Sequence, residues 1–347
     1  MLKDFLWPTA GKKINNNLNH RSFTAIKNTI HRSDCPLVSV IIPYYNDLKY
    51  IHEAIQSCLD NTYQHFEIII VDDGSYSPLK AEDLRADARI TILRNPENRG
   101  SGCARNRGIR HAQGELIAFL DADDLWFPDI LDKQVRIFLS DPSAVWVYTN
   151  GYYLIEGKIM RHPNSYYHGF RKGFPQGFGV NQYHLRGYNY MTFSSNMFKK
   201  DVLFEVGLFN ETLRVSEDWD LFVRVAEKHP VHAIDTPLMY YRVNNAGRHF
   251  VNRDDYVKVN TQILEEMYQR QNLLPARAGD LETAIAVVYE RAGIQRLNAG
   301  LNKEARRFLF HPRAKPLSQK LRMLGLRALS FLPTIFYKTA LWIFDHL

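Results

Sequence analysis

Four short apolar runs alternate with segments of helical spacing in the first third of the chain. The runs lie at 37–42, 66–71, 90–93 and 116–120. A short apolar run bounded by turn residues is typical of a strand buried on both faces, and we expect Pro43 to end the first one. Strands that alternate with helices predict a mainly parallel α/β sheet flanked by helices.

Polar side chains follow three of these four runs. They are Asn46 and Asp47 after the first run, Asp72 and Asp73 after the second, and Asp121, Asp123 and Asp124 after the fourth. Ligands of such sheets bind beyond the carboxyl ends of the strands, and neighbouring carboxylates favour a hard divalent cation. Asp is also common in solvated turns, but that explanation would have to hold separately for three loops at one edge of the sheet.

A glycine-containing, basic segment lies between the third and fourth runs, at 95–114. It does not fit the dinucleotide-binding fingerprint, because Arg105 stands where that pattern needs glycine and the segment follows the third strand. A helix start that carries Arg99, Arg105 and Arg107 favours phosphate groups. The alternative interpretation is a solvated basic helix face.

The composition is that of an ordinary globular protein, with 347 residues, 45% hydrophobic and 23% charged. Its three cysteines have no paired spacing, so neither a disulfide framework nor a zinc site is indicated. The N-terminus lacks the apolar core of a signal peptide, and no apolar stretch reaches the about 20 residues of a membrane span. From Lys303 onward, nine basic and two acidic residues account for the whole net charge of +7. This is a basic tail rather than a nucleic-acid-binding face, so we expect no nucleic-acid partner.

Taken together, the segments VSVIIPYYN, VDDGS, NRGSGCARNRG, LDADD and SEDWDLFVR resemble the family 2 glycosyltransferases of the GT-A fold. The likeness covers roughly residues 37–245 and extends to Tyr240-Tyr241-Arg242. It implies a Rossmann-like GT-A sheet, a nucleotide-sugar donor (a UDP-sugar by preference), Mg²⁺ or Mn²⁺ as cofactor, and transfer to an acceptor hydroxyl with inversion.

The resemblance also implies a donor site, residue by residue. Asp72 matches the aspartate that contacts the nucleoside base, with Asp73 nearby. Pro43 and Tyr45 stand where the first loop packs on the base and ribose, and Arg105 stands where the helix after the glycines meets the donor.

The resemblance assigns Asp121 to the ribose and sugar side and Asp123 to the metal on the diphosphate. Many family members add a histidine two residues after the Tyr-Arg pair, but Asn244 occupies that position here and the next histidine is His249. Either His249 completes the metal site, together with Asp121 and Asp123, or the site uses fewer protein ligands.

Asp218 matches the family's catalytic base, and the local pattern supports it. Ser216 is a favourable N-cap, which places Asp218 in the first helical turn and on the apolar face. We expect Asp220 and Arg224 to form an i,i+4 pair on the outside of this helix. Glu217 is the alternative base.

We expect four parts: an extension (1–34), the GT-A domain (35–245), a helical appendage (246–312) and a basic amphipathic tail (313–347). Helical patterns cover 255–270, 281–297 and 302–310 in the appendage. The tail is interpreted as an interfacial helix pair on an anionic membrane, with a packed terminal helix or a dimer contact as alternatives. Aromatic residues are frequent at 151–200, and we expect them either to contact the acceptor or to pack within loops. The pattern at 191–198 predicts a strand.

The expected function is sugar transfer in surface polysaccharide or lipid-linked glycan synthesis, in the cytoplasm or at the inner face of the plasma membrane. The acceptor is then a glycan or a lipid-linked saccharide. A nucleotidyltransferase of similar topology is one alternative, but it needs a glycine-rich basic loop where PYYND stands. A non-catalytic sugar-binding relative is the other, although such a protein is expected to lose these carboxylates.

Overall fold

The computed structural model describes residues 35–163, 191–243, 253–270, 278–298 and 301–313. His249, the tail from 314 onward and the N-terminal extension therefore lie outside the described residues. The described strands are β1 (Val38–Tyr44), β2 (Phe66–Asp72), β3 (Ile90–Arg94), β4 (Leu116–Phe119), β5 (Leu125–Trp126), β6 (Trp146–Ile155), β7 (Lys158–Pro163), β8 (Asn196–Lys199) and β9 (His232–Val243).

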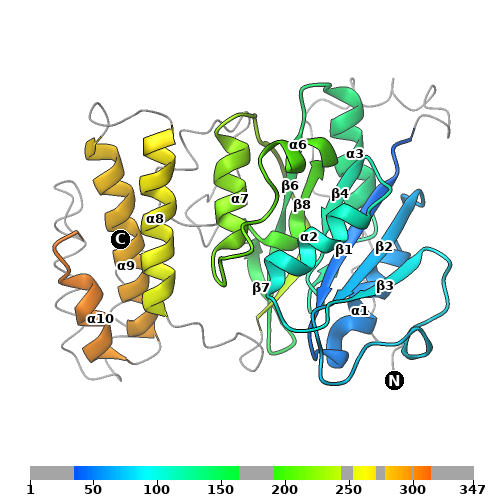
Figure 1. Ribbon diagram of the computed structural model, residues 1–347, viewed down its shortest axis with the longest axis horizontal. Helices are drawn as coiled ribbons and strands as arrows, with labels where there is room; N and C mark the ends of the chain where they lie inside the picture. Colours follow the sequence, from blue (N-terminus) through cyan, green and yellow to red (C-terminus); the bar gives the residue numbers. More distant parts are fainter. Residues whose placement is uncertain (1–34, 164–190, 244–252, 271–277, 299–300, 314–347) are drawn as a thin grey trace. The chain divides into compact units, whose positions relative to one another are not determined.

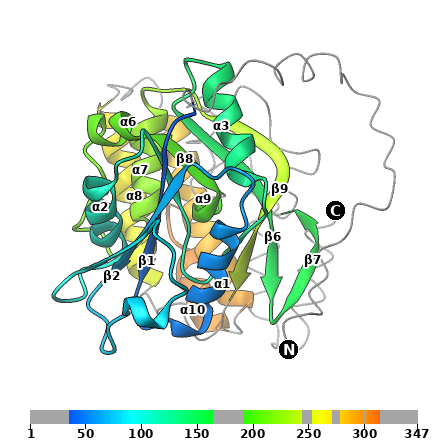
Figure 2. The ribbon, with the colours of Figure 1, turned by 90° about the vertical axis from the view of Figure 1, so that its right-hand side faces the viewer.

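These strands form one mixed sheet in the order β3-β2-β1-β4-β8-β6-β9-β5, with β7 paired to β6 (Figures 1 and 2). The pairs among β3, β2, β1 and β4 are parallel, which confirms the predicted α/β sheet of the N-terminal half. Beyond β4 the pairing changes, because β8 runs antiparallel to both β4 and β6. Only β6 and β9 are parallel to each other in this second half.

Helices cover both faces of the sheet. They are α1 (Leu48–Leu59), α2 (Ser101–His111), α3 (Ile130–Ser140), α6 (Lys200–Glu205) and α7 (Glu217–Ala226). Figure 2 shows α1 and α3 on one face and α2, α6 and α7 on the other. Side chains alternate across a strand, so Ile41 faces α2, where Gly108 leaves room for its Cγ2.

Strand β1 passes through Pro43 and ends at Tyr44, so the prediction that Pro43 stops the strand was wrong. The carbonyl oxygens of Leu37 and Ile41 accept hydrogen bonds from the β4 side, which places Pro43 on the same side. The β4 pairing ends at Ile41. Pro43 therefore interrupts no ladder hydrogen bond, and a proline is tolerated there.

Two other expected elements are shorter than the sequence pattern suggested. The segment at 191–198 begins with a 3-10 turn, η4 (Phe193–Ser195), and only then becomes β8. Between β2 and β3, where the alternation of strands and helices predicts a helix, the described chain forms only the 3-10 turn η3 (Ala81–Asp83). Two side chains of η4, Phe193 and Ser194, are buried and contact residues of the site described below.

An aromatic cluster fixes η4 and α7 against the sheet. Phe193 stacks on Phe222 with 5.8 Å between ring centroids, and Trp146 stacks on Phe198 at 5.2 Å. All four side chains are buried. This packing holds the start of α7 near the end of β4, although almost a hundred residues separate them in the sequence.

The C-terminal helices α8 (Arg253–Arg270), α9 (Ala278–Asn298) and α10 (Asn302–Leu309) confirm the predicted helical appendage. A Cβ added at Gly293 of α9 would come within 2.5 Å of Leu309 in α10, so these two helices pack closely. Among the described residues, none of the helices is long and apolar enough to cross a membrane.

Candidate active site

The ends of four parallel strands, β1 to β4, meet at one edge of the sheet. Tyr44 of β1 pairs in register with Asp72 of β2, and Asp72 pairs with Arg94 of β3. The chain continues from β4 directly into Asp121. This is the edge at which the sequence placed a ligand site.

Asp72 is fully buried and shapes the loop that follows β2. Its carboxylate accepts hydrogen bonds from the backbone N–H groups of Ser75 (2.8 Å) and Leu79 (3.2 Å) and from the guanidinium of Arg94. Arg94 was not singled out from the sequence, although its place at the end of the third strand could have pointed to it. The base contact implied for Asp72 stays a prediction.

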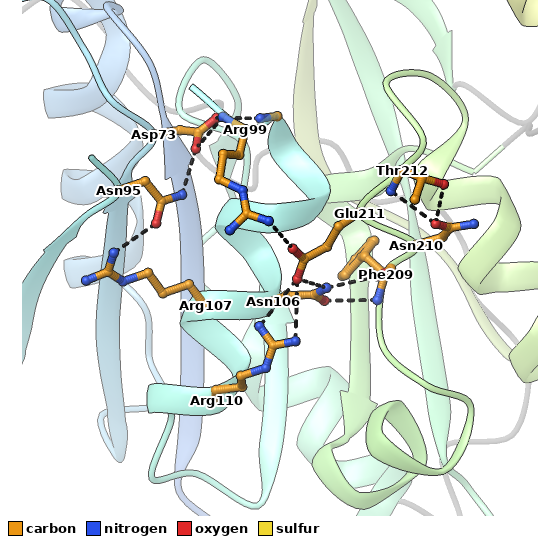
Figure 3. A network of polar contacts seen from close by, with 11 residues as sticks. Asp73, Asn95, Arg99, Asn106, Arg107, Arg110, Phe209, Asn210, Glu211 and Thr212 are labelled. Atoms are coloured by element: carbon orange, nitrogen blue, oxygen red, sulfur yellow. Dashed lines mark hydrogen bonds and ion pairs between the residues drawn. The ribbon is translucent and has the colours of Figure 1, made fainter. Parts of the chain in front are cut away.

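Asp73 anchors the loop that leads into α2 (Figure 3). Its carboxylate accepts hydrogen bonds from the backbone N–H groups of Arg99 (3.1 Å) and Gly100 (2.7 Å) and from the Asn95 side chain (2.7 Å). It is also buried. Asp73 therefore sets the position of the first turn of α2, and its place beside the donor stays a prediction.

Gly74, between Asp73 and Ser75, is expected to tolerate no side chain. Its φ is +74°, and an added Cβ would lie 2.4 Å from the carbonyl carbon of Glu97. An alanine at positive φ costs roughly 1 kcal/mol of folding stability. Gly74→Ala should cost several times as much, because of this close approach. Gly157→Ala is the matched control, with φ +77° and no atom within 4 Å. Chemical denaturation measures both, and equal losses would contradict the close approach.

Two tyrosines lie beside the carboxyl ends of β1 and β2. The ring of Tyr45 is 6.2 Å from that of Tyr76, which is 90% exposed. The side chain of Asn46 joins the two loops, because its Oδ1 accepts a hydrogen bond from the Tyr76 backbone (2.9 Å). The packing of Tyr45 on a base stays a prediction, as does the role of Pro43, which lies within β1. Tyr76 is an additional exposed ring that the sequence reading did not single out.

Arg105 connects the end of β4 with the start of α7. Its Nη2 donates to Asp121 Oδ1 and its Nη1 donates to Glu217 Oε1, both at 2.8 Å. The guanidinium is 5% exposed and lies over the Phe193 ring at 3.9 Å. The buried contacts of Arg105 are therefore to protein carboxylates, and the predicted donor contact of Arg105 stays a prediction.

Asp124, which had no role in the sequence reading, holds the strand ends together. It is fully buried and accepts hydrogen bonds from the Ser194 hydroxyl and from the Arg242 backbone N–H (2.8 Å). Burial raises the pKa of Asp124 well above its usual range, and the charges of Asp123 and Asp121 raise it further. No local pattern could have shown these contacts, because their partners lie 70 and 118 residues away.

Asp218 lies in the first turn of α7 and is half-buried. Burial is the first cause that raises its pKa to about 7, and the charge of Glu217 is the second. Ser216 occupies the N-cap position as expected, but in a left-handed conformation (φ +56°) and without a side-chain capping hydrogen bond. A carboxylate that titrates near neutrality is suited to proton transfer.

The predicted pair between Asp220 and Arg224 is present at 2.6 Å, but its predicted outside location was wrong. Asp220 is only 5% exposed. Arg224 also donates to the carbonyl oxygens of Val206 and Leu208. The segment after α6 therefore covers the helix face that an isolated amphipathic pattern would leave in solvent.

A second group of contacts holds the segment before α7 on α2 (Figure 3). Asn106 and Phe209 form two reciprocal hydrogen bonds, from Asn106 Nδ2 to Phe209 O and from Phe209 N to Asn106 Oδ1, each 2.9 Å. Glu211 accepts hydrogen bonds from Arg99 (3.1 Å) and Asn106 (2.9 Å) and pairs with Arg110 (3.4 Å). These contacts fix the approach of α7 and thereby the place of Asp218.

Asp121 and Asp123 are the predicted metal ligands, and both are half-buried after β4. Within the part of the chain that the structure describes, no group of three His, Cys, Asp or Glu side chains could hold a metal alone. Mg²⁺ and Mn²⁺ are commonly held by one or two carboxylates together with substrate phosphates. Two carboxylates therefore fit a metal that shares its ligands with a diphosphate.

Residues 39–206 match the family model described as Glycosyl transferase family 2. The chain is 31% identical over 222 residues to an uncharacterized glycosyltransferase of Rickettsia felis, which covers 61% of this chain but 35% of that relative. It is 42% identical over 124 residues to the putative teichuronic acid biosynthesis glycosyltransferase TuaG of Bacillus subtilis, covering 35% of this chain and 48% of TuaG. The chain thus spans less than half the length of these relatives.

Solved structures share the fold. TarS of S. aureus superposes with a TM-score of 0.57 at 16% identity, over 84% of this chain and 80% of that one. The mannosyltransferase PcManGT of Pyrobaculum calidifontis gives 0.54 at 20% identity, over 89% and 84%. These similarities confirm the GT-A type of sheet, and the family match confirms the family expected from the motifs. The chain belongs to glycosyltransferase family 2, through the domain that residues 39–206 cover.

Proposed function

We propose that this chain transfers a sugar from a nucleotide-sugar donor to an acceptor hydroxyl with inversion at the anomeric carbon. One observation carries the proposal. The guanidinium of Arg105 binds both Asp121, at the end of β4, and Glu217, the neighbour of Asp218. In this proposal, the carboxylates that bind the donor and the base that activates the acceptor are neighbours in one site. An inverting transfer needs the donor diphosphate and the base on opposite sides of the sugar carbon that reacts.

The donor is held at the edge formed by β1, β2 and β4. In this proposal Tyr45 packs on the base, Asp72 and Asp73 shape and line the base pocket, and Pro43 supports the ribose. TarS has been solved with UDP and with UDP-GlcNAc, and PcManGT with GDP-Man and Mn²⁺. These complexes support a nucleotide-sugar donor, for which we favour a UDP-sugar.

Asp123 and Asp121 would hold Mg²⁺ or Mn²⁺, and His249 is a third candidate ligand. When bound, the metal supplies positive charge against the diphosphate as that group leaves. Arg105 keeps the Asp121 carboxylate oriented from the protein side.

Asp218 acts as the general base. It takes the proton of an acceptor hydroxyl, the hydroxyl oxygen forms a bond to the sugar C1, and the C1–oxygen bond to the diphosphate breaks on the opposite face. The nucleoside diphosphate leaves with the electron pair, and the proton stays on Asp218. The pKa of about 7 suits this step, because about half of the base is then deprotonated at neutral pH and the anion still binds a proton well.

The acceptor is a glycan or a lipid-linked saccharide in surface polysaccharide synthesis. The identity shared with TuaG supports this class. We place the reaction at the cytoplasmic face of the plasma membrane, with the basic tail at 313–347 as a peripheral contact. Vesicle flotation with and without the tail tests that contact, and equal binding contradicts it.

A donor screen tests the proposed reaction. UDP-, GDP- and dTDP-sugars are offered to the full chain, and nucleotide release is measured with and without Mn²⁺. We expect one nucleotide class to be released in a metal-dependent manner. Release of a sugar 1-phosphate in place of a nucleoside diphosphate would indicate nucleotidyl transfer.

The rate of transfer should rise with pH and level off above about pH 7. The raised pKa of Asp218 means that the reactive anion is lost as pH falls through 7, about tenfold per pH unit below it. The same shift lowers folding stability as pH rises from the unfolded-state pKa toward 7, since the native state then holds the extra proton. A kcat/KM profile of the wild-type chain checks the first effect, and a rate independent of pH between 5 and 8 contradicts it.

A further inference from the structure

Glu217 directly precedes the proposed base, Asp218, yet its contacts indicate a structural role and not proton transfer. Its Oε1 accepts hydrogen bonds from the Ser101 hydroxyl and from Arg105 Nη1 (2.8 Å). The side chain is 12% exposed. Gly102 of α2 lies beside it, since an added Cβ there would be in ordinary contact with Glu217 Cγ at 3.5 Å. Glu217 is therefore built into the contact between α7 and the first turn of α2.

Arg105, the partner of Glu217, is shared between two carboxylates. One guanidinium nitrogen binds Glu217 and the other binds Asp121. The remaining nitrogen, Nε, is buried without a hydrogen-bond partner. The guanidinium carbon lies over the Phe193 ring, 3.9 Å from its centroid. Both terminal nitrogens of Arg105 are thus engaged, one by Glu217 and the other by Asp121.

This sharing has a consequence for Asp121. Arginine and a carboxylate prefer a bidentate pair, in which two N–H groups bind both carboxylate oxygens. Here Glu217 occupies one side of the fork, so Arg105 contacts Asp121 through Oδ1 alone. Among the described residues, Oδ2 of Asp121 has no hydrogen-bond partner.

We propose that Glu217 is a positioning residue that holds half of the Arg105 fork and thereby keeps the second oxygen of Asp121 available to the metal and the donor diphosphate. The proposal rests on the proposed function. It assigns Glu217 a role distinct from that of Asp218, although the two residues are adjacent. In this proposal the start of α7, which carries the base that activates the acceptor, also supports the carboxylate that binds the donor.

The neutral variants Glu217→Gln and Asp218→Asn separate this role from a general effect of charge. Each removes one negative charge near Asp121 and keeps the shape of the side chain. The readout is the affinity for Mn²⁺, titrated by electron paramagnetic resonance in the presence of saturating UDP or GDP, whichever the wild-type chain binds. Thermal unfolding confirms that both variants are folded.

We expect Glu217→Gln to weaken Mn²⁺ binding about tenfold, at the low end of the effect of removing a residue that supports a metal ligand. Asp218→Asn should change it by less than about twofold, because the carboxylate that binds Arg105 Nη1 belongs to Glu217. In the background of Arg105→Met, Glu217→Gln should have no further effect, since its influence passes through Arg105.

Two results overturn the proposal. One is equal Mn²⁺ affinity in Glu217→Gln and wild type, and the other is an equal loss in Glu217→Gln and Asp218→Asn, which would indicate charge alone. A wild-type chain that binds neither nucleotide with Mn²⁺ contradicts the proposed function itself, and the inference with it. The first two results leave metal-dependent nucleotide binding intact, so the two kinds of failure are distinguishable.

Discussion

Asp218→Asn is expected to reduce sugar transfer by about 10²–10⁴-fold, the usual contribution of a positioned general base. Donor binding should stay near the wild-type value, because Asp218 faces the acceptor in the proposed site. Stability at pH 8 should be retained or raised, since the variant removes a desolvated charge next to Glu217. Transfer rate, donor affinity and thermal unfolding of the same preparation test the three parts.

Asp220→Asn is the matched control, with the same chemical change two residues further along α7. Asp220 is buried and pairs with Arg224 at 2.6 Å, so its loss should lower stability while the folded enzyme keeps its kcat. Full transfer activity in Asp218→Asn would exclude it as the base. Glu217, the residue beside it, would then be the next candidate.

Arg105→Met is expected to destabilise the fold by about 3 kcal/mol. The substitution leaves Asp121 and Glu217 without their common cation, and breaking a buried ion pair in this way costs about 3–5 kcal/mol. The lower end applies because Asp121 is 27% exposed and retains access to water. Urea denaturation at neutral pH measures the loss. Metal-dependent donor binding should fall as well, because Asp121 is no longer oriented.

Arg99→Met is the control for this substitution. Arg99 precedes the same helix and pairs with Glu211 at 3.1 Å, but its side chain is 53% exposed. An exposed ion pair contributes roughly 0.2–1 kcal/mol, so the loss should be much smaller than for Arg105→Met. Equal losses in the two variants would show that the buried bridge between β4 and α7 adds little to stability.

The sequence predicted the part of the fold that local pattern determines. Buried parallel strands appear as short β-branched runs, so β1, β2 and β4 were found within about two residues of their bounds. Carboxylates at the ends of parallel strands must share one edge, so the sequence alone predicts Asp73 and Asp121 at the same edge of the sheet.

The rest depends on pairing between distant segments. Arg105 was expected near the donor, but nothing local indicates that its partners are Asp121 and a glutamate 112 residues away. The antiparallel strand β8 likewise depends on its fit beside β4 rather than on its own pattern. Asp220 was assigned to solvent because helical periodicity describes one helix alone and does not show which segment packs over it.

The most direct measurement is nucleotide release from the donor that the screen identifies, with Mn²⁺ and after chelation. The wild-type chain is compared with the double variant Asp121→Asn/Asp123→Asn, which keeps the size of both side chains. We predict acceptor-dependent release by the wild type with Mn²⁺, loss of release after chelation, and recovery when Mn²⁺ is restored only in the wild type. Equal release by the two proteins, or release that chelation leaves unchanged, would contradict a metal-dependent sugar transfer at the end of β4.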